Sequence, residues 1–212
     1  MPFNLGKRLI IGIDFDNTLI RYDSLFYKLA AQKEFISGEF PKDKTAIRDF
    51  VRALPDGETK WQRLQALAYG PEIEDAFLPE GLVDFFGFCK EKGIKIYIVS
   101  HKTKFASQSI SRDNLRKCAL GWMERRGFFD SDGFGISRNN VFFESTREKK
   151  IMRIVQLKCG HFIDDLEEIF LEPKFPGNTG KILYAPQGTI ISAPGLVILK
   201  SWNAIKDYFS SE

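Results

Sequence analysis

The chain has 212 residues, of which 43% are hydrophobic and 28% are charged, a composition typical of a soluble globular protein with one substantial core. The formal net charge of +3 is too small to indicate a nucleic-acid polymer as partner. Three widely spaced cysteines argue against a disulfide framework and against a zinc site. With no signal-like segment and no apolar stretch of membrane-spanning length, we expect a cytoplasmic protein that does not bind membranes. The oligomeric state is not predicted.

The first predicted strand ends in acidic residues. Residues 9–13 form a short apolar run, typical of a strand buried on both faces of a parallel sheet. Asp14 and Asp16 follow, and residues two apart at a strand end can point the same way. A cation usually relieves such crowding of like charges, and oxygen ligands suit Mg²⁺. Taken alone, these acids are equally consistent with a polar loop that caps a turn.

Apolar residues at helical spacing predict three short helices between residues 21 and 79, with no convincing strand. A simple crossover between parallel strands needs far fewer residues, so we predict a small helical cap over the strand ends. The alternative is that these helices only cover one sheet face. The three apolar faces are formed by Leu25, Phe26, Leu29 and Ala30, by Ile47, Phe50, Val51 and Leu54, and by Trp61, Leu64 and Ala68.

From residue 80 onward, strand and helix patterns alternate, which predicts a parallel sheet with helices on both faces. Residues 104–113 are expected to form a long surface loop. We therefore predict an α/β protein with a doubly wound, Rossmann-like parallel sheet in residues 1–20 and 80–212, and an all-helical cap in residues 21–79. The predicted later strands span residues 94–99, 141–143, 161–163, 182–184 and 196–199.

Four signals occur in order along this pattern, each at a predicted strand end or helix start. They are the acidic motif Asp14-Phe15-Asp16-Asn17-Thr18, a strand ending in Ser100, a lysine at position 149 or 150, and the pair Asp164-Asp165. Together they resemble the haloacid dehalogenase (HAD) superfamily of Mg²⁺-dependent phosphotransferases. The resemblance covers nearly the whole chain outside the helical insert and implies a phosphatase type with a small C1-type cap.

The resemblance also implies roles for the acids. Asp14 is the expected nucleophile, which forms an aspartyl-phosphate, and Asp16 is the expected general acid and base. Mg²⁺ is expected to be bound by the Asp14 carboxylate, the Asp16 backbone carbonyl and Asp165, with Asp164 acting through water.

Three further positions complete the expected site. Thr18 is expected to hold the Asp14 loop, and Ser100 to donate a hydrogen bond to a phosphoryl oxygen. His101 either contacts the substrate or only fixes its loop. We favour Lys150 as the catalytic lysine because it shares a helical face with apolar residues, although Lys149 stays open.

An acid two residues after the nucleophile favours chemistry in which an alkoxide leaving group must be protonated. We therefore predict a phosphatase that hydrolyses a small phosphate monoester, such as a sugar phosphate, a nucleotide or a related metabolite. A sugar phosphomutase of the same superfamily and a non-catalytic phosphate-binding or scaffold protein are the alternatives. The insert offers six candidates for recognising the leaving group, none of which is assigned: Arg21, Tyr22, Lys60, Trp61, Arg63 and Tyr69.

Overall fold

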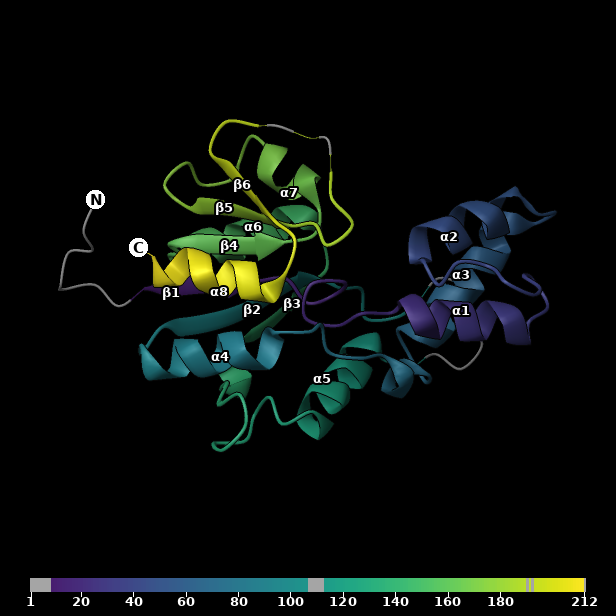
Figure 1. Cartoon of the computed structure of the whole chain (residues 1–212), viewed down its shortest axis with the longest axis horizontal. Helices are drawn as coiled ribbons and strands as arrows, with labels where there is room; N and C mark the ends of the chain where they lie inside the picture. Colours follow the sequence, from purple (N-terminus) through teal and green to yellow (C-terminus); the bar gives the residue numbers. More distant parts are fainter. Residues whose placement is uncertain (1–8, 107–112, 190, 192, 212) are drawn as a thin grey trace. The chain divides into compact units, whose positions relative to one another are not determined.

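A computed structural model of the chain describes residues 9–106, 113–189, 191 and 193–211 (Figure 1). The chain divides into two compact units. The core unit comprises Met1–Leu19, Leu78–His101 and Gly127–Glu212, and the helical unit comprises Ile20–Phe77 and Lys102–Arg126. The start of the chain and most of the loop predicted at 104–113 lie outside the described residues. No helix in the described ranges is both long and apolar enough to cross a membrane.

The core unit contains a sheet of six parallel strands in the order β3-β2-β1-β4-β5-β6. This order is that of the doubly wound fold and confirms the predicted fold class. The order reverses between β1 and β4, and ligands of such sheets bind at the carboxyl ends of the strands beside that point. The strands are β1 (Ile10–Ile13), β2 (Lys95–His101), β3 (Val141–Glu144), β4 (His161–Asp164), β5 (Gly180–Tyr184) and β6 (Leu196–Leu199).

Helices cover both faces of this sheet (Figure 1). On one face α4 (Leu82–Glu91) packs against α8 (Trp202–Ser210), and the ring centroids of Phe85 and Trp202 lie 5.0 Å apart. On the other face α6 (Arg147–Gln156) and the short α7 (Glu167–Leu171) enclose an apolar cluster with the sheet. The buried members of this cluster include Val99, Ile154, Phe162, Ile169, Phe170 and Leu183.

The central strand β1 packs closely against side chains of its neighbour β4 and of the turn before β4 because residue 12 is a glycine. A Cβ atom on Gly12 would lie 2.5 Å from the ring of Phe162 and 2.9 Å from Sγ of Cys159. Both of these neighbours are buried, so neither has open space to move into. The close packing of β1 against β4 therefore depends on the missing side chain.

Among its described residues, the helical unit contains four helices, α1 (Asp23–Gln32), α2 (Lys44–Ala53), α3 (Gly57–Ala68) and α5 (Leu115–Arg125), and a 3-10 turn η1 at Ile73–Asp75. The ring of Phe26 stacks on Trp61 with centroids 4.7 Å apart. The segment 102–126 joins this unit through Trp122, whose indole Nε1 donates to the Ala76 carbonyl at 3.2 Å, and through an ion pair between Arg125 and Glu74. Whether the unit acts as a cap stays a prediction.

Two details of the insert differ from the sequence prediction. The sequence predicts Phe50 on the apolar face of its helix, and this prediction is wrong, because 42% of the residue is exposed and its ring packs beside Phe40. The buried stripe of α2 is narrow and holds only Ile47 and Val51. An isolated antiparallel bridge also joins Arg21 to Phe77, so the two ends of the 20–77 segment are hydrogen-bonded to each other.

We predict that Gly12→Ala lowers the free energy of unfolding by about 1–3 kcal/mol, because the added methyl group overpacks a buried contact. Gly87→Ala is the matched control: Gly87 lies on the exposed side of α4 with nothing near its Cβ position. That change should stabilise the protein by about 0.5–1 kcal/mol through helix propensity. Urea denaturation followed by circular dichroism measures both. Equal effects of the two substitutions would contradict the packing argument.

Candidate active site

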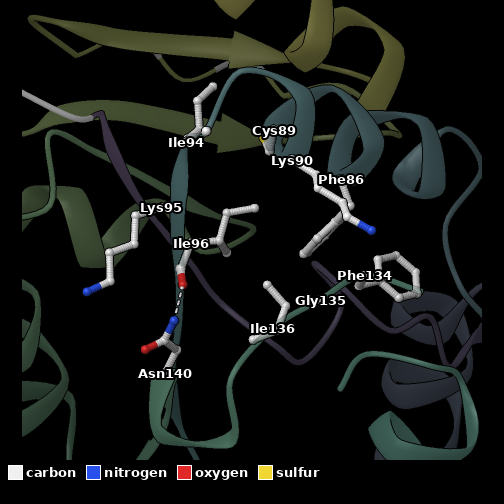
Figure 2. Close-up of a pocket in the computed structure, with 11 residues that line it drawn as sticks. Phe86, Cys89, Lys90, Ile94, Lys95, Ile96, Phe134, Gly135, Ile136 and Asn140 are labelled. Carbon is white, nitrogen blue, oxygen red and sulfur yellow. Dashed lines mark hydrogen bonds between the residues drawn. The ribbon is translucent and has the colours of Figure 1, made fainter. Parts of the chain in front are cut away.

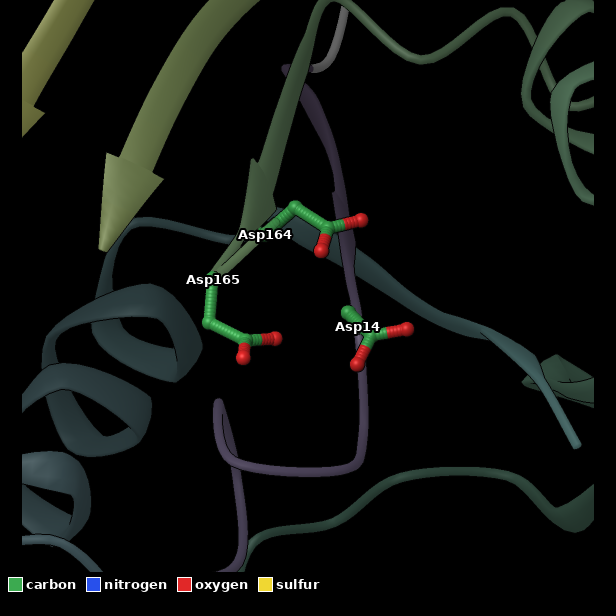
Figure 3. Close-up of side chains that lie close together, drawn as sticks. All are labelled: Asp14, Asp164 and Asp165. Carbon is green, nitrogen blue, oxygen red and sulfur yellow. The ribbon is translucent and has the colours of Figure 1, made fainter. Parts of the chain in front are cut away.

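Neighbouring strands bring three acids together at the carboxyl end of the sheet (Figure 3). Asp14 follows β1, while Asp164 ends β4 and Asp165 comes next. The two strands pair with Ile13 opposite Ile163, and the Asp14 amide donates to the Ile163 carbonyl at 2.9 Å. As a result, one carboxylate oxygen from each acid lies within 4.8 Å of the other two. Pairing of strands far apart in sequence thus assembles the acid cluster.

Lys150 reaches this cluster from α6, a helix that packs on one face of the sheet. Its Nζ lies 2.5 Å from Oδ1 of Asp14 and 2.6 Å from Oδ2 of Asp164, and only 2% of the lysine is exposed. Helix α6 begins after Thr146, whose Oγ1 accepts a hydrogen bond from the Lys149 amide at 3.2 Å. Lys149 itself is exposed. Of the two candidate lysines, the structure brings Lys150 to the acids and leaves Lys149 at the surface.

The electrostatics of the cluster favour an additional cation. Burial raises the pKa of Asp14 well above its usual value, Lys150 opposes this, and the charges of Asp164 and Asp165 add to it. Burial lowers the pKa of Lys150, but the ion pairs with Asp14 and Asp164 outweigh it and hold that pKa above its usual range. Three carboxylates and one ammonium leave two negative charges when all are ionised. An all-oxygen donor set of this charge fits a divalent metal ion such as Mg²⁺.

Thr18 supports the loop that carries the first acids. Its Oγ1 donates to Oδ1 of Asp165 at 3.3 Å, and its carbonyl accepts a hydrogen bond from Nε1 of Trp202 at 3.3 Å. Asn17 adopts the left-handed conformation with φ of 59°, which turns the chain sharply between the acids and Thr18. The contact with Trp202 lies 184 residues away in sequence, and no local sequence signal predicts it.

The other predicted residues lie around the same strand ends of the core unit. Ser100 is buried near the end of β2, and His101 is exposed. Partial burial of its ring lowers the pKa of His101; a hydrogen bond with the Ser145 backbone opposes this, and the nearby Lys150 charge lowers the pKa further. The side chain is therefore mainly neutral at pH 7. Asp16 is half-buried in the loop after β1.

A separate cavity of about 340 Å³ lies beside the amino end of β2 (Figure 2). It is lined by residues of α4, by residues 93–96 and by residues 134–136. Polar groups on its wall have protein partners: Nζ of Lys90 donates to the Ser131 carbonyl at 2.6 Å, and Nδ2 of Asn140 donates to the Ile96 carbonyl at 3.2 Å. Since Ser100 lies near the opposite end of the same strand, this cavity is not part of the acid cluster.

No protein-family model matches the chain. A curated relative, 2-hydroxy-3-keto-5-methylthiopentenyl-1-phosphate phosphatase of Geobacillus thermodenitrificans (strain NG80-2), is 35% identical over 101 residues. This match covers 45% of the chain and 44% of the relative, so it spans less than half the length of either protein.

Solved structures match over almost the full length at low sequence identity. A haloacid dehalogenase-like family hydrolase from Streptococcus pneumoniae gives a TM-score of 0.60 with 15% identity and covers 95% of this chain and 98% of its own. A HAD family hydrolase from Deinococcus radiodurans R1, with bound phosphate and sodium, gives a TM-score of 0.54 with 10% identity, and the match covers 96% of each chain. The Bacillus subtilis protein YfnB, bound to magnesium, gives a TM-score of 0.54 with 13% identity. The match covers 95% of this chain and 99% of YfnB.

These matches agree with the parallel α/β sheet of the core unit. The chain therefore has the fold of the HAD-superfamily hydrolases, as its sequence motifs predict.

Proposed function

We propose that this protein is a Mg²⁺-dependent phosphatase that hydrolyses a small phosphate monoester through an aspartyl-phosphate on Asp14. The observation that carries the proposal is the buried cluster in which Lys150 pairs with Asp14 and Asp164 beside Asp165. The phosphatase activity of the curated relative and the phosphate bound to the Deinococcus radiodurans protein support it. The expected location in the cytoplasm stays a prediction.

The acids divide the reaction into two displacements. Asp14 attacks phosphorus and the ester P–O bond breaks, while Asp16 donates a proton to the departing oxygen. Asp16 then removes a proton from a water molecule, which attacks the phosphorus of the aspartyl-phosphate and releases inorganic phosphate and free Asp14. Lys150 orients the nucleophile and favours its ionised form, because their charges are opposite and the pair is buried.

The remaining residues would bind the metal ion and the phosphoryl group. In this proposal Mg²⁺ would be bound by the carboxylates of Asp14 and Asp165 and the backbone carbonyl of Asp16, with Asp164 acting through water. The ion would supply positive charge that offsets the charge of the nucleophile and the phosphoryl oxygens. Ser100 donates a hydrogen bond to a phosphoryl oxygen, Thr18 holds the loop through Asp165, and neutral His101 contacts the substrate.

An assay of the purified chain against a panel of phosphate monoesters, with Mg²⁺ or with EDTA, tests this function. We expect phosphate release that requires Mg²⁺ and falls at least about 10³-fold in Asp14→Asn, because this change removes the nucleophile. Circular dichroism checks that the variant is folded. Metal-independent release, or an active Asp14→Asn variant, would contradict the proposal. Isomerised sugar phosphate with little free phosphate would instead indicate a phosphomutase. No reaction with any of the esters would indicate a phosphate-binding protein.

A matched pair of substitutions tests the lysine. Lys150→Met should lower kcat by at least about 10²-fold, because it removes a positive group next to the nucleophile. It should also destabilise the protein by about 3–5 kcal/mol, since two buried acids lose their partner. Lys149→Met should change neither property, because Lys149 is exposed and its Nζ contacts only Ser145 among the described residues. Steady-state kinetics at a temperature where both variants are folded decides between the two lysines.

Metal binding should release protons. The pKa of Asp14 is raised in the metal-free protein, mainly by burial, and a bound cation would lower it. A fraction of Asp14 is therefore protonated at low pH and must ionise on binding, so the affinity for Mg²⁺ should rise with pH until the raised pKa is passed. Calorimetric titration in buffers of different ionisation enthalpy, between about pH 5 and pH 8, measures the released protons. A pH-independent affinity without proton release would refute this coupling.

A further inference from the structure

Helix α6 carries the lysine of the acid cluster, and its apolar contacts alone do not fix where that lysine lies. Ile151 and Ile154 are buried against the core. Apolar contacts have no preferred direction, so they tolerate a small rotation or shift of the helix. Lys150 is a long side chain whose ammonium group must reach both Asp14 and Asp164. A directional contact near Lys150 is therefore needed to hold its ammonium group in place.

Arg153 makes such a contact one turn further along the helix. Residues three apart in a helix are separated by about 4.5 Å along its axis and lie on nearly the same side. Nε of Arg153 donates to Oε1 of Glu144 at 2.8 Å, and its Cζ lies 4.6 Å from the ring centroid of Phe142. Glu144 and Phe142 are two residues apart in β3, so they project from the same face of that strand. One arginine thus joins α6 to two side chains of the sheet.

Two other ion pairs of the same helix have a different character. Arg147 pairs with Glu172 at 3.2 Å and Glu148 pairs with Lys174 at 2.5 Å, and these four side chains are 35–72% exposed. Both partners lie directly after α7 and not in the sheet. The side chain of Glu144, in contrast, is 16% exposed and that of its arginine partner 34%. Of these three pairs, only the one with Glu144 joins α6 to a strand, and it is the least screened by water.

We propose that Arg153 and Glu144 are positioning residues, which hold α6 at the rotation and axial position at which Lys150 reaches both acids. The proposal rests on the phosphatase function proposed above. The pair acts through Lys150: a shift of the ammonium group changes its distance from the nucleophile, and small errors in distance slow a chemical step strongly. Because the pair is partly exposed, it contributes little to the overall stability of the protein.

Steady-state kinetics with phenyl phosphate and Mg²⁺ tests the effect on the reaction. We expect Arg153→Gln and Glu144→Gln each to lower kcat about tenfold with KM unchanged, because the displaced lysine acts in the chemical step. The double variant should be no slower than either single variant, since both changes remove the same contact. Arg153→Lys keeps the charge and should recover most of the rate. Lys174→Gln is the matched control: it removes an exposed ion pair of the same helix and should leave kcat unchanged.

Acetylation of lysines measures how firmly Lys150 is held and needs no turnover. In EDTA, a limiting amount of acetic anhydride should modify the exposed Lys149 much faster than the buried Lys150, which makes Lys149 an internal reference. Acetylation of Lys150 should be at least about threefold faster in Arg153→Gln and in Glu144→Gln, because local opening costs less without the contact. Mass spectrometry of peptides measures both lysines, and thermal unfolding checks that every variant is folded.

Several results would overturn the proposal. One is wild-type kcat and wild-type acetylation of Lys150 in both glutamine variants, and another is an equal loss of kcat in Lys174→Gln. A loss of kcat without faster acetylation of Lys150 also contradicts it, because the pair would then act on the reaction directly. So does faster acetylation in an enzyme whose kcat is unchanged. If the wild type hydrolyses no ester, faster acetylation still supports the positioning of Lys150, so this inference and the phosphatase activity can fail separately.

Discussion

The candidate site depends on one buried contact, the ammonium group of Lys150 between Asp14 and Asp164. Taking these charges out of water costs several kcal/mol per ion, and only close opposite charges offset that cost. The contact forms only when β1, β4 and α6 are all in place, because each contributes one charge. Folding of the core unit and assembly of the acid cluster are therefore the same event. A substitution that breaks the contact affects stability and chemistry together.

Packing of the sheet determines how closely these charges can approach. Gly12 lets the ring of Phe162 and the thiol of Cys159 rest directly on β1, and the register of β1 with β4 places position 14 opposite position 164. The site is thus held by a packed core on one side and by the Thr18 turn on the other. Groups held this way need little reorganisation during a reaction, which is the main physical advantage of a preorganised site.

The helical unit has a different physical character from the acid cluster. Its centre is aromatic, and Trp61, which the sequence left open as a substrate contact, is 1% exposed and stacks on Phe26 as part of that core. Two lysines also lie over the ring of Tyr69 in this unit: Lys44 at the start of α2, and Lys102 directly after β2.

The sequence by itself determined the strand and helix order, the acids at the strand ends and hence the fold class, because hydrophobic periodicity and motif spacing are local properties. It also favoured Lys150 over Lys149, since helical periodicity alone indicates which of two adjacent residues faces the sheet. Only the tertiary structure decided that residues 102–126 pack with the insert and that Phe50 is exposed. The burial of Lys102 and the contact of Trp202 with Thr18 were likewise decided by tertiary structure, because both depend on segments that lie far apart in the chain.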